Sequence, residues 1–291
     1  MIKLFKGDCL IESDKIESGS VDLILTDLPY GTIINLYKNT GWDVIIDPNK
    51  IFIIANRILR KNGKMILFAQ EPFSSSLINS ATWEIPFNQR LIWEKDSCGN
   101  MLFAKKACVN FHEDVLVFTK IETGSESAAQ KYINNELLQS GKNKHSFREV
   151  LTTDVIGHTF TKPNRFRLPT ENNYLKIKGI ANGYYLKTYK QLQNLNNKDK
   201  KSSTFNLWEG KKYKSNILKY KKDYNGFHPT QKPVLLLEDL IKTFSNEGDL
   251  VVDLTMGSGS TGVACVNTNR NFTGIEKDET YFNIAKERMK N

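Results

Sequence analysis

Residues 249–262 read DLVVDLTMGSGSTG, an apolar run that leads into a glycine-rich turn and then a helical stretch. A strand, a glycine-rich turn and a helix in this order are typical of α/β folds that bind a nucleotide-like cofactor. Gly257 and Gly259 are expected to let a ligand approach the backbone, and Asp253 offers a carboxylate for a cationic or hydroxylated group. After the next apolar strand stands Glu276, where an acid commonly binds ribose hydroxyls. These segments favour a cofactor that contains adenosine.

The rest of the chain alternates predicted strands and helices. Strands are predicted at 21–26, 64–69, 89–94, 114–119, 250–254 and 271–275, and helices at 48–60, 233–245, 261–268 and 279–289. This order predicts a doubly wound α/β fold with a mostly parallel sheet. The strands at 89–94 and 114–119 have no obvious helix between them, so we expect them to pair antiparallel. Their connection, 96–110, is either a plain hairpin or a loop near the substrate.

A second motif, TDLPYG at residues 26–31, follows another apolar run. It places a carboxylate (Asp27), the carbonyl of Pro29 and the ring of Tyr30 in one turn. The exocyclic amino group of a nucleobase is a poor nucleophile, because its lone pair is delocalised into the ring. Two acceptors that bond its hydrogens would draw the nitrogen toward tetrahedral geometry, while an aromatic ring stacks the base. The motif suggests methylation of a nucleobase amine; the alternative is an ordinary exit from a strand, because Asp, Pro and Gly are common in turns.

Between these motifs lies HPTQKP at residues 228–233, followed by an apolar-periodic stretch. By itself it predicts a helix that begins at a proline and packs on the sheet. The three segments in this order resemble the β-class amino-methyltransferases of DNA. The resemblance covers residues 1–120 and 223–291. It implies a class I methyltransferase-like fold with an antiparallel last strand, a circularly permuted motif order and S-adenosyl-L-methionine as the cofactor.

The resemblance also implies roles for individual residues. Asp27, Pro29 and Tyr30 match the catalytic Asp-Pro-Pro-Tyr motif. Asp8 is similar to the acid that faces the adenine amino group of the cofactor, and Lys232 lies in the segment that flanks its methionine end. The cofactor-binding residues implied in this way are Asp8, Lys232, Asp253, Gly257, Ser258, Gly259, Thr261 and Glu276.

Two positions depart from the family pattern. Leu28 replaces the first proline of the catalytic motif, which leaves both acceptors and the stacking ring in place. Leu254 and Thr255 replace the usual Pro-Phe and so remove an aromatic side chain that often packs near the cofactor. We expect the first change to be tolerated and the second to weaken cofactor affinity.

Positive charge is concentrated in one part of the chain, whose net charge is +9. Residues 121–222 carry 20 Lys and Arg against 8 Asp and Glu, whereas the remainder carries 21 against 24. This segment is predicted to be an inserted target-recognition region that binds double-stranded DNA, within a catalytic domain of residues 1–120 and 223–291. A solvated Lys/Asn-rich loop is the alternative, and it is favoured for the run Lys198–Lys201.

Tyrosines in the insert are expected to combine base stacking with hydrogen bonding; they are Tyr174, Tyr184, Tyr185, Tyr189, Tyr213 and Tyr220. The candidate readers of base edges are Arg165, Arg167, Asn172 and Asn173. They cluster around Pro169 rather than in a run of lysines.

Composition favours a cytoplasmic enzyme with no membrane association. The chain of 291 residues is long enough to bury a full core, and it shows no apolar stretch suited to a signal peptide or a membrane span. Its four cysteines include no Cys-x-x-Cys pair, so neither zinc nor any other metal is expected, and the thiols are expected to be reduced and buried. His112 is expected to be structural or to face the target, because the neighbouring Glu113 would point to the opposite side of a strand.

The resulting hypothesis is a DNA methyltransferase specific for adenine N6, acting by direct transfer, with Asp27 as an acceptor whose pKa is not strongly shifted. Cytosine-N4 methylation is the nearest alternative, although members of that group usually carry Ser at the position of Asp27. RNA, a protein glutamine, an inactive DNA-binding protein of the same fold and a nicotinamide-dependent oxidoreductase are further alternatives. A cognate restriction nuclease and a homodimer remain open.

Overall fold

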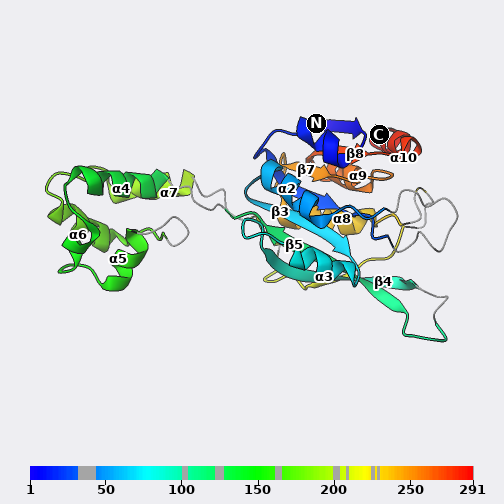
Figure 1. Ribbon diagram of the computed structural model, residues 1–291, viewed down its shortest axis with the longest axis horizontal. Helices are drawn as coiled ribbons and strands as arrows, with labels where there is room; N and C mark the ends of the chain where they lie inside the picture. The colour runs from blue at the N-terminus through cyan, green and yellow to red at the C-terminus, as the bar shows by residue number, and fades with distance from the viewer. Residues whose placement is uncertain are drawn as a thin grey trace. The chain divides into compact units, whose positions relative to one another are not determined.

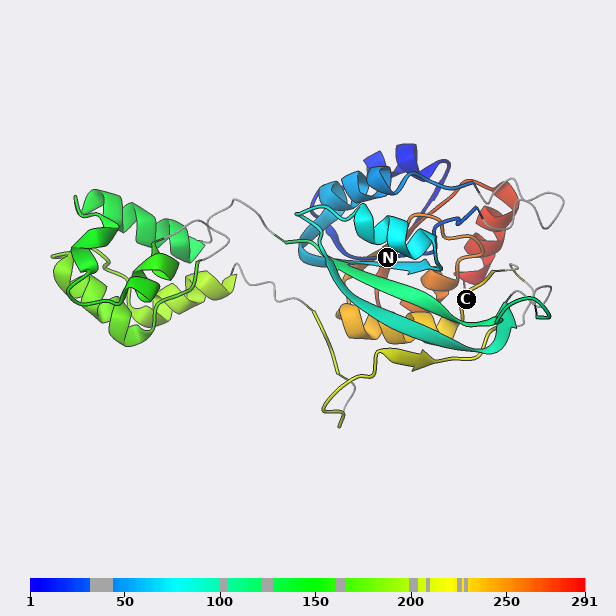
Figure 2. The same cartoon turned by 60° about the horizontal axis from the view of Figure 1, so that its bottom comes forward.

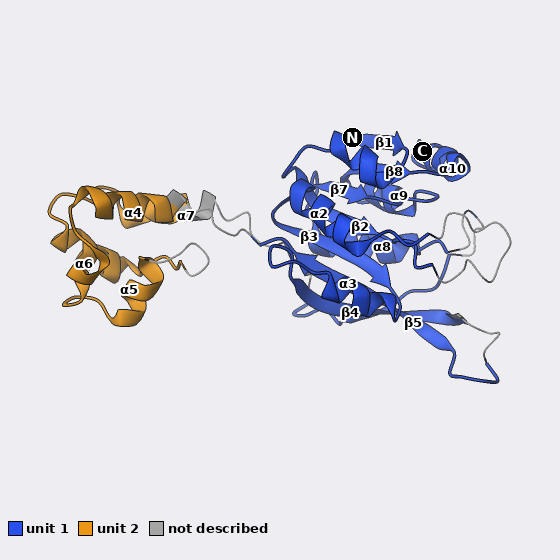
Figure 3. Ribbon diagram, in the orientation of Figure 1, with its two compact units in different colours: residues 1–121, 203–291 blue, residues 122–202 orange. Residues whose placement is uncertain are grey.

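The computed structural model describes residues 1–31, 44–99, 104–121, 128–160, 166–198, 204–207, 210–223, 227 and 230–290. The chain divides into two compact units, one of residues 1–121 and 203–291 and the other of residues 122–202 (Figure 3). The described residues of 204–222, which were predicted to belong to the insert, are therefore part of the first unit. The reason is that Ile217–Lys219 form a strand at the edge of its sheet.

The first unit is built on a sheet of eight strands within the described residues, in the order β1-β8-β7-β2-β3-β5-β4-β6 (Figure 1). The strands are β1 (Ile2–Lys6), β2 (Val21–Thr26), β3 (Leu59–Ala69), β4 (Phe87–Gly99), β5 (Asn110–Thr119), β6 (Ile217–Lys219), β7 (Leu250–Asp253) and β8 (Asn271–Glu276). Neighbours from β1 to β3 are parallel, and so are β4 and β6. Among the strands that the structure describes, β5 alone runs antiparallel to its neighbours, β3 and β4, so the predicted doubly wound, mostly parallel fold is confirmed.

Helices cover both faces of this sheet (Figure 2). Because successive residues of a strand point to opposite faces, Ile24 of β2 packs with α2 (Pro48–Ile58) and α3 (Phe73–Asn79). Leu23 and Leu25 pack on the other face, with α8 (Val234–Phe244), α9 (Ser260–Asn267) and α10 (Glu279–Arg288). The short helix α1 (Cys9–Glu12) follows β1 and contributes Cys9 to the first face. The four predicted helices are present, each with a boundary that differs by one or two residues at most.

The ends of these helices follow from local sequence. α2 begins after Asp47, whose carboxylate accepts a hydrogen bond from the Asn49 N–H at 2.9 Å, and Pro48 occupies its first turn. α10 begins in the same way after Asp278, which accepts from the Tyr281 N–H at 3.0 Å. Such caps satisfy N–H groups that a helix leaves without a partner.

The second unit is helical and has its own core. It contains α4 (Ala128–Gln139), α5 (Thr153–Thr159), α6 (Glu171–Ile180), α7 (Tyr189–Lys198) and a 3-10 turn at Lys144–Phe147. Tyr174 and Tyr185 belong to this core, and their hydroxyls donate to the carbonyls of Lys187 at 2.9 Å and Ile133 at 3.0 Å. The expectation that these two rings serve DNA was wrong, because burial of the aromatic ring outweighs exposure of its polar tip. Tyr184 and Tyr213 are exposed.

The carboxyl ends of β1, β8, β7, β2 and β3 lie side by side, as parallel strands require. We call this row of strand ends the carboxyl edge of the sheet, to distinguish it from the edge strands β1 and β6. The start of β5 lies at this same edge, because Asp114 pairs with Ala69 at the end of β3. Loops that carry chemistry in α/β folds are concentrated at this edge. Within the described part of the chain, no helix is both long enough and apolar enough to cross a membrane.

Candidate active site

The turn after β2 is tied to the loop after β7. The Thr26 hydroxyl donates to a carboxylate oxygen of Asp253 at 2.8 Å, and the Thr255 hydroxyl donates to the backbone carbonyl of Asp27 at 2.9 Å. Leu28 is only 1% exposed and packs in the core between β2 and α2. A leucine at this position is therefore accommodated by burial, while Asp27 and Tyr30 on either side point toward each other.

Both carboxylate oxygens of Asp27 are hydrogen-bonded. Oδ1 accepts from the Tyr30 hydroxyl at 2.7 Å, and Oδ2 accepts from Nζ of Lys232 at 2.6 Å. The Lys232 ammonium also lies 5.8 Å from the centre of the Tyr30 ring and 5.1 Å from that of Phe68. Lys232, which the sequence placed beside the methionine end of a cofactor, contacts the predicted catalytic acid. Its side chain is only 9% exposed.

Glu113 also belongs to this group of residues, although it was not predicted as a site residue. Its side chain is 4% exposed, and its Oε1 atom lies 2.8 Å from the Tyr30 hydroxyl oxygen and 3.0 Å from Nζ of Lys232. Its Oε2 atom lies 2.9 Å from Nζ of Lys95 on β4. We call Asp27, Tyr30, Lys95, Glu113 and Lys232 the acid–lysine cluster. It brings together the turn after β2, a residue of β4, a residue of β5 and Lys232, which precedes α8.

A signal for Glu113 was present in the sequence. Glu113 shares its strand phase with Val115 and Val117, which are buried on one face of the sheet. A carboxylate in the buried phase of a strand requires a charged partner. His112, in the opposite phase, is exposed.

The pKa values of the two carboxylates of the cluster are shifted in opposite directions. Burial raises the pKa of Asp27 more than the Lys232 ammonium lowers it. Burial also acts to raise the pKa of Glu113, but Lys232 and Lys95 outweigh it and hold this pKa at about 2. The carboxylates raise the pKa of Lys232 above its usual value despite burial. The two lysines thus favour the ionised form of Glu113, whereas burial favours the protonated form of Asp27.

The loop after β7 is organised by Asp253, which is buried. Its Oδ1 atom accepts from Thr26 and from the Thr255 N–H at 3.1 Å, and its Oδ2 atom accepts from the Thr261 hydroxyl at 2.6 Å. Burial raises its pKa to about 6. Asp253 and Thr261, both predicted to bind the cofactor, are thus bonded to each other and shape the loop from within.

The two glycines of this loop have different roles. Gly257 has a φ of +51°, and its N–H donates to Oε2 of Glu276 at 2.9 Å. Gly259 has a φ of +82°, and a Cβ atom there would lie 2.8 Å from that of Ala285 on α10. Gly259 therefore permits close packing against α10 in a left-handed backbone conformation, and its predicted role beside the cofactor stays a prediction.

The remaining predicted cofactor residues lie around this loop. Ser258 is buried, and its carbonyl and hydroxyl accept from Arg288 at 2.8 and 3.2 Å. Asp8 caps α1 through the Leu10 N–H at 3.0 Å. Asp8 and Glu276 end neighbouring strands at the same edge of the sheet and keep partly exposed carboxylates. This pair of acceptors suits the hydroxyl and amino donors of an adenosine.

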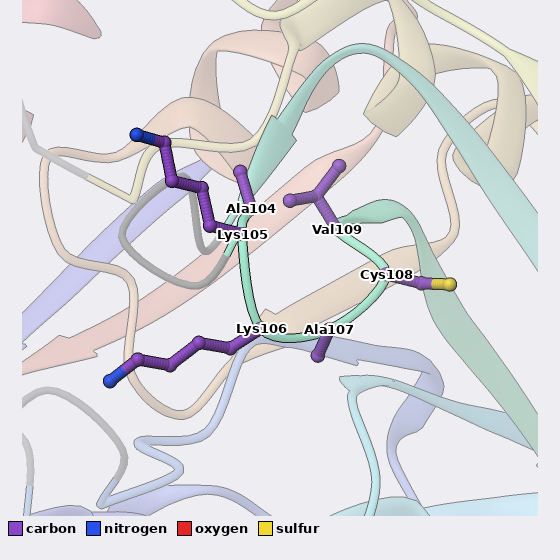
Figure 4. Close-up of a pocket in the computed structure, with 6 residues that line it drawn as sticks. All are labelled: Ala104, Lys105, Lys106, Ala107, Cys108 and Val109. Atoms are coloured by element: carbon purple, nitrogen blue, oxygen red, sulfur yellow. The ribbon is translucent and has the colours of Figure 1, made fainter.

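The β4–β5 hairpin projects from this edge. Residues 104–109 line a hollow in its loop, and Lys105 and Lys106 extend from the same side of it (Figure 4). Cys108 is exposed, unlike the buried Cys9 and Cys265, so the expectation of buried thiols was wrong there.

The predicted base-reading residues belong to the helical unit. Arg167 and Asn172 are exposed, and the Asn173 N–H donates to the Thr170 hydroxyl at 3.3 Å at the start of α6. Arg165 lies outside the described residues.

Comparison with known proteins agrees with this architecture. The sequence profile of a family described as DNA methylase, N6/N4 type, matches residues 21–287. The chain is 26% identical to the DNA adenine methyltransferase YhdJ of Escherichia coli (strain K12) over 98% of this chain and 82% of that protein. It is 25% identical to the type II methyltransferase M.HpaI of Haemophilus parainfluenzae, over 94% and 69% of the two chains.

Solved structures share the fold at low identity. A complex of M1.HpyAVI with SAM gives a TM-score of 0.58 at 19% identity and covers 100% of both chains. The PvuII DNA methyltransferase, described as cytosine-N4-specific, gives 0.55 at 13% identity and covers 99% of this chain and 86% of that one. The family profile spans most of the sequence, and the chain therefore belongs to the N6/N4 family of DNA methylases.

Proposed function

We propose that this chain transfers the methyl group of S-adenosyl-L-methionine to the N6 amino group of adenine in double-stranded DNA. The observation that supports this most directly is the turn after β2. There the carboxylate of Asp27 lies 2.7 Å from the hydroxyl of Tyr30, and Thr255 links the turn to the glycine loop. An acceptor, an aromatic ring and a cofactor loop are thus adjacent.

The proposed chemistry is a direct transfer. The target adenine leaves the base stack, which costs a few kcal/mol. Asp27 and the carbonyl of Pro29 accept hydrogen bonds from its amino group, while the ring of Tyr30 stacks on the base. The amino nitrogen forms a bond to the methyl carbon as the bond from that carbon to sulfur breaks. One proton then leaves the nitrogen for the carboxylate of Asp27.

We assign contacts with the cofactor to carboxylates that are partly exposed near the carboxyl ends of the parallel strands. Asp8 and Glu276 are the proposed partners of the adenosine, because their carboxylates are partly exposed there. Asp253, Ser258 and Thr261 are proposed to hold the loop in shape, since their polar atoms bond within the chain. When bound, the cofactor supplies an electrophilic methyl group on a sulfonium.

Adenine is preferred over cytosine because of the acid at position 27. The expectation for cytosine-N4 enzymes is a serine there, and the similar protein YhdJ bears the name of a DNA adenine methyltransferase. Cytosine-N4 methylation remains the second candidate, because a protein described as cytosine-N4-specific shares the fold.

The helical unit is the proposed target-recognition region, with Arg165, Arg167, Asn172 and Asn173 as readers of base edges. Its excess of Lys and Arg supports contact with phosphates. A cognate restriction nuclease is proposed because several similar proteins are type II methyltransferases. Homodimer formation stays a proposal to be measured by light scattering.

The function is tested by incubating the purified chain with unmethylated genomic DNA and labelled S-adenosyl-L-methionine, then identifying the methylated nucleoside by mass spectrometry. We expect N6-methyladenine at a defined sequence. Asp27→Ala should lose on the order of 10²-fold or more in turnover, with cofactor binding and folding retained. Labelled N4-methylcytosine would establish the second candidate, and near-normal turnover by Asp27→Ala would exclude Asp27 from the chemistry.

A further inference from the structure

In the acid–lysine cluster, the Tyr30 hydroxyl faces two carboxylates but has only one hydrogen to donate. The Tyr30 hydroxyl lies 2.7 Å from Oδ1 of Asp27 and 2.8 Å from Oε1 of Glu113. A phenol carries a single hydrogen, so it donates to only one of two ionised carboxylates at a time. If Asp27 is protonated, both contacts become hydrogen bonds, from Asp27 to Tyr30 and from Tyr30 to Glu113. The geometry is therefore suited to holding one added proton on Asp27.

The charges of the cluster determine which carboxylate takes that proton. Glu113 faces two ammonium groups, at 2.9 Å from Lys95 and 3.0 Å from Lys232, whereas Asp27, within the described residues, faces the ammonium of Lys232 alone. Two carboxylates and two ammonium groups leave the cluster neutral. An ionised Glu113 thus balances Lys95, which otherwise would add to the positive field on Asp27.

We propose that Glu113 is a positioning residue for methyl transfer: it neutralises Lys95 and Lys232 and orients the Tyr30 hydroxyl, so that Asp27 accepts the proton released by the amino nitrogen. This inference rests on the proposed function. When the nitrogen–carbon bond forms and the carbon–sulfur bond breaks, the positive charge of the sulfonium passes to the nitrogen. The proton then moves to Asp27 and later to solvent, while Glu113 stays ionised throughout.

Substitutions of Glu113 and of Lys95 should shift the pH dependence of kcat in opposite directions. Glu113→Gln adds one net positive charge beside Asp27, which favours the ionised carboxylate and makes it a weaker base. We expect the acid limb of the profile of kcat against pH to move to lower pH, and kcat to fall on the order of 10-fold. Lys95→Gln adds one net negative charge, so the acid limb should move to higher pH. The double variant restores neutrality and should return the midpoint toward that of the wild type.

Glu94→Gln is the matched control, because it removes the same charge from a residue next to Lys95. Glu94 lies in an exposed ion pair with Lys219, where solvent screens its field. Its profile should superimpose on that of the wild type. Tyr30→Phe keeps the stacking ring but removes the hydroxyl, and it should change the acid limb without changing affinity for S-adenosyl-L-methionine, measured by calorimetry.

The outcomes separate the inference from the proposed function. A wild-type chain that methylates no base in DNA would overturn both. A wild-type chain that methylates DNA, with Glu113→Gln giving the wild-type profile, overturns the inference alone. Additive losses in the double variant, with no return of the midpoint, show that Glu113 serves only packing. If Glu113→Gln fails to fold, the double variant and Tyr30→Phe still decide between these outcomes.

Discussion

The hydroxyl of Thr255 donates a hydrogen bond of 2.9 Å to the backbone carbonyl of Asp27. These residues belong to the glycine-rich loop after β7 and to the turn after β2, and they are 228 residues apart in sequence. The family pattern implies a phenylalanine at position 255, which has no group able to make this bond. The departure that was expected only to remove an aromatic side chain thus supplies a direct link between the two motifs.

Thr255→Val tests this link, because valine keeps the branched shape and removes the hydroxyl. We expect a loss of about 1 kcal/mol in the free energy of unfolding, the usual effect of removing one partly buried hydrogen bond. Turnover should fall as the Asp27 turn loses a constraint. Thr255→Ser retains the hydroxyl and should behave like the wild type in both denaturant unfolding and methyl transfer. Equal stability and turnover in the valine variant would show that the bond is not needed.

Gly259→Ala is expected to destabilise the fold even without cofactor. The substitution meets two penalties, a φ of +82° and a Cβ atom 2.8 Å from that of Ala285. Gly248 has a φ of +79° with no atom within 4 Å of an added Cβ, so Gly248→Ala isolates the backbone penalty, about 1–2 kcal/mol. Thermal unfolding of the two variants should show the larger loss at position 259. Equal losses would mean that α10 shifts to accept the methyl group.

Asp253 should make stability depend on pH. Its pKa is raised from 3.8 to about 6 in the folded chain, so the folded state binds this proton more tightly than the unfolded state does. The resulting stabilisation is complete below pH 4 and is lost as the pH rises through 6, on the order of 3 kcal/mol.

Denaturant unfolding of the wild type and Asp253→Asn from pH 4 to 7 checks this sign. The wild type should lose stability relative to the variant as the pH increases. A difference that is constant with pH would contradict the assignment to Asp253.

The helical unit should contribute to DNA affinity through phosphates and to specificity through base edges. Replacing exposed lysines such as Lys176 and Lys190 with alanine should reduce the log–log salt dependence of binding by about 0.9 for each phosphate that is no longer neutralised, with the methylated sequence unchanged. Arg167→Ala or Asn172→Ala should instead reduce discrimination by about 1–3 kcal/mol with little change in salt dependence. Salt titrations of binding and sequencing of methylated sites measure the two effects. Deletion of 122–202 that leaves both intact would place recognition in the first unit.

Much of the fold was predictable because its signals are local. The apolar run 21–25 and the motif that follows it fix a strand and the turn at its end, and the structure has β2 at Val21–Thr26. The strands β1 and β6 were not predicted. They lie at the two edges of the sheet, and neither has a continuous apolar run: β1 reads IKLFK, in which lysines interrupt the apolar residues, and β6 reads ILK.

The sequence by itself determined the order of the motifs, the parallel sheet and the presence of Asp27, Pro29 and Tyr30 in one turn. These features depend on backbone preference and apolar periodicity, which act over a few neighbouring residues and can therefore be read from the sequence. Only the tertiary structure decided that Lys232 reaches Asp27 across 205 positions, and that Glu113 meets both Tyr30 and Lys95. Those contacts depend on the register of β5 against β3 and β4, and register follows from packing across the whole sheet rather than from any single segment.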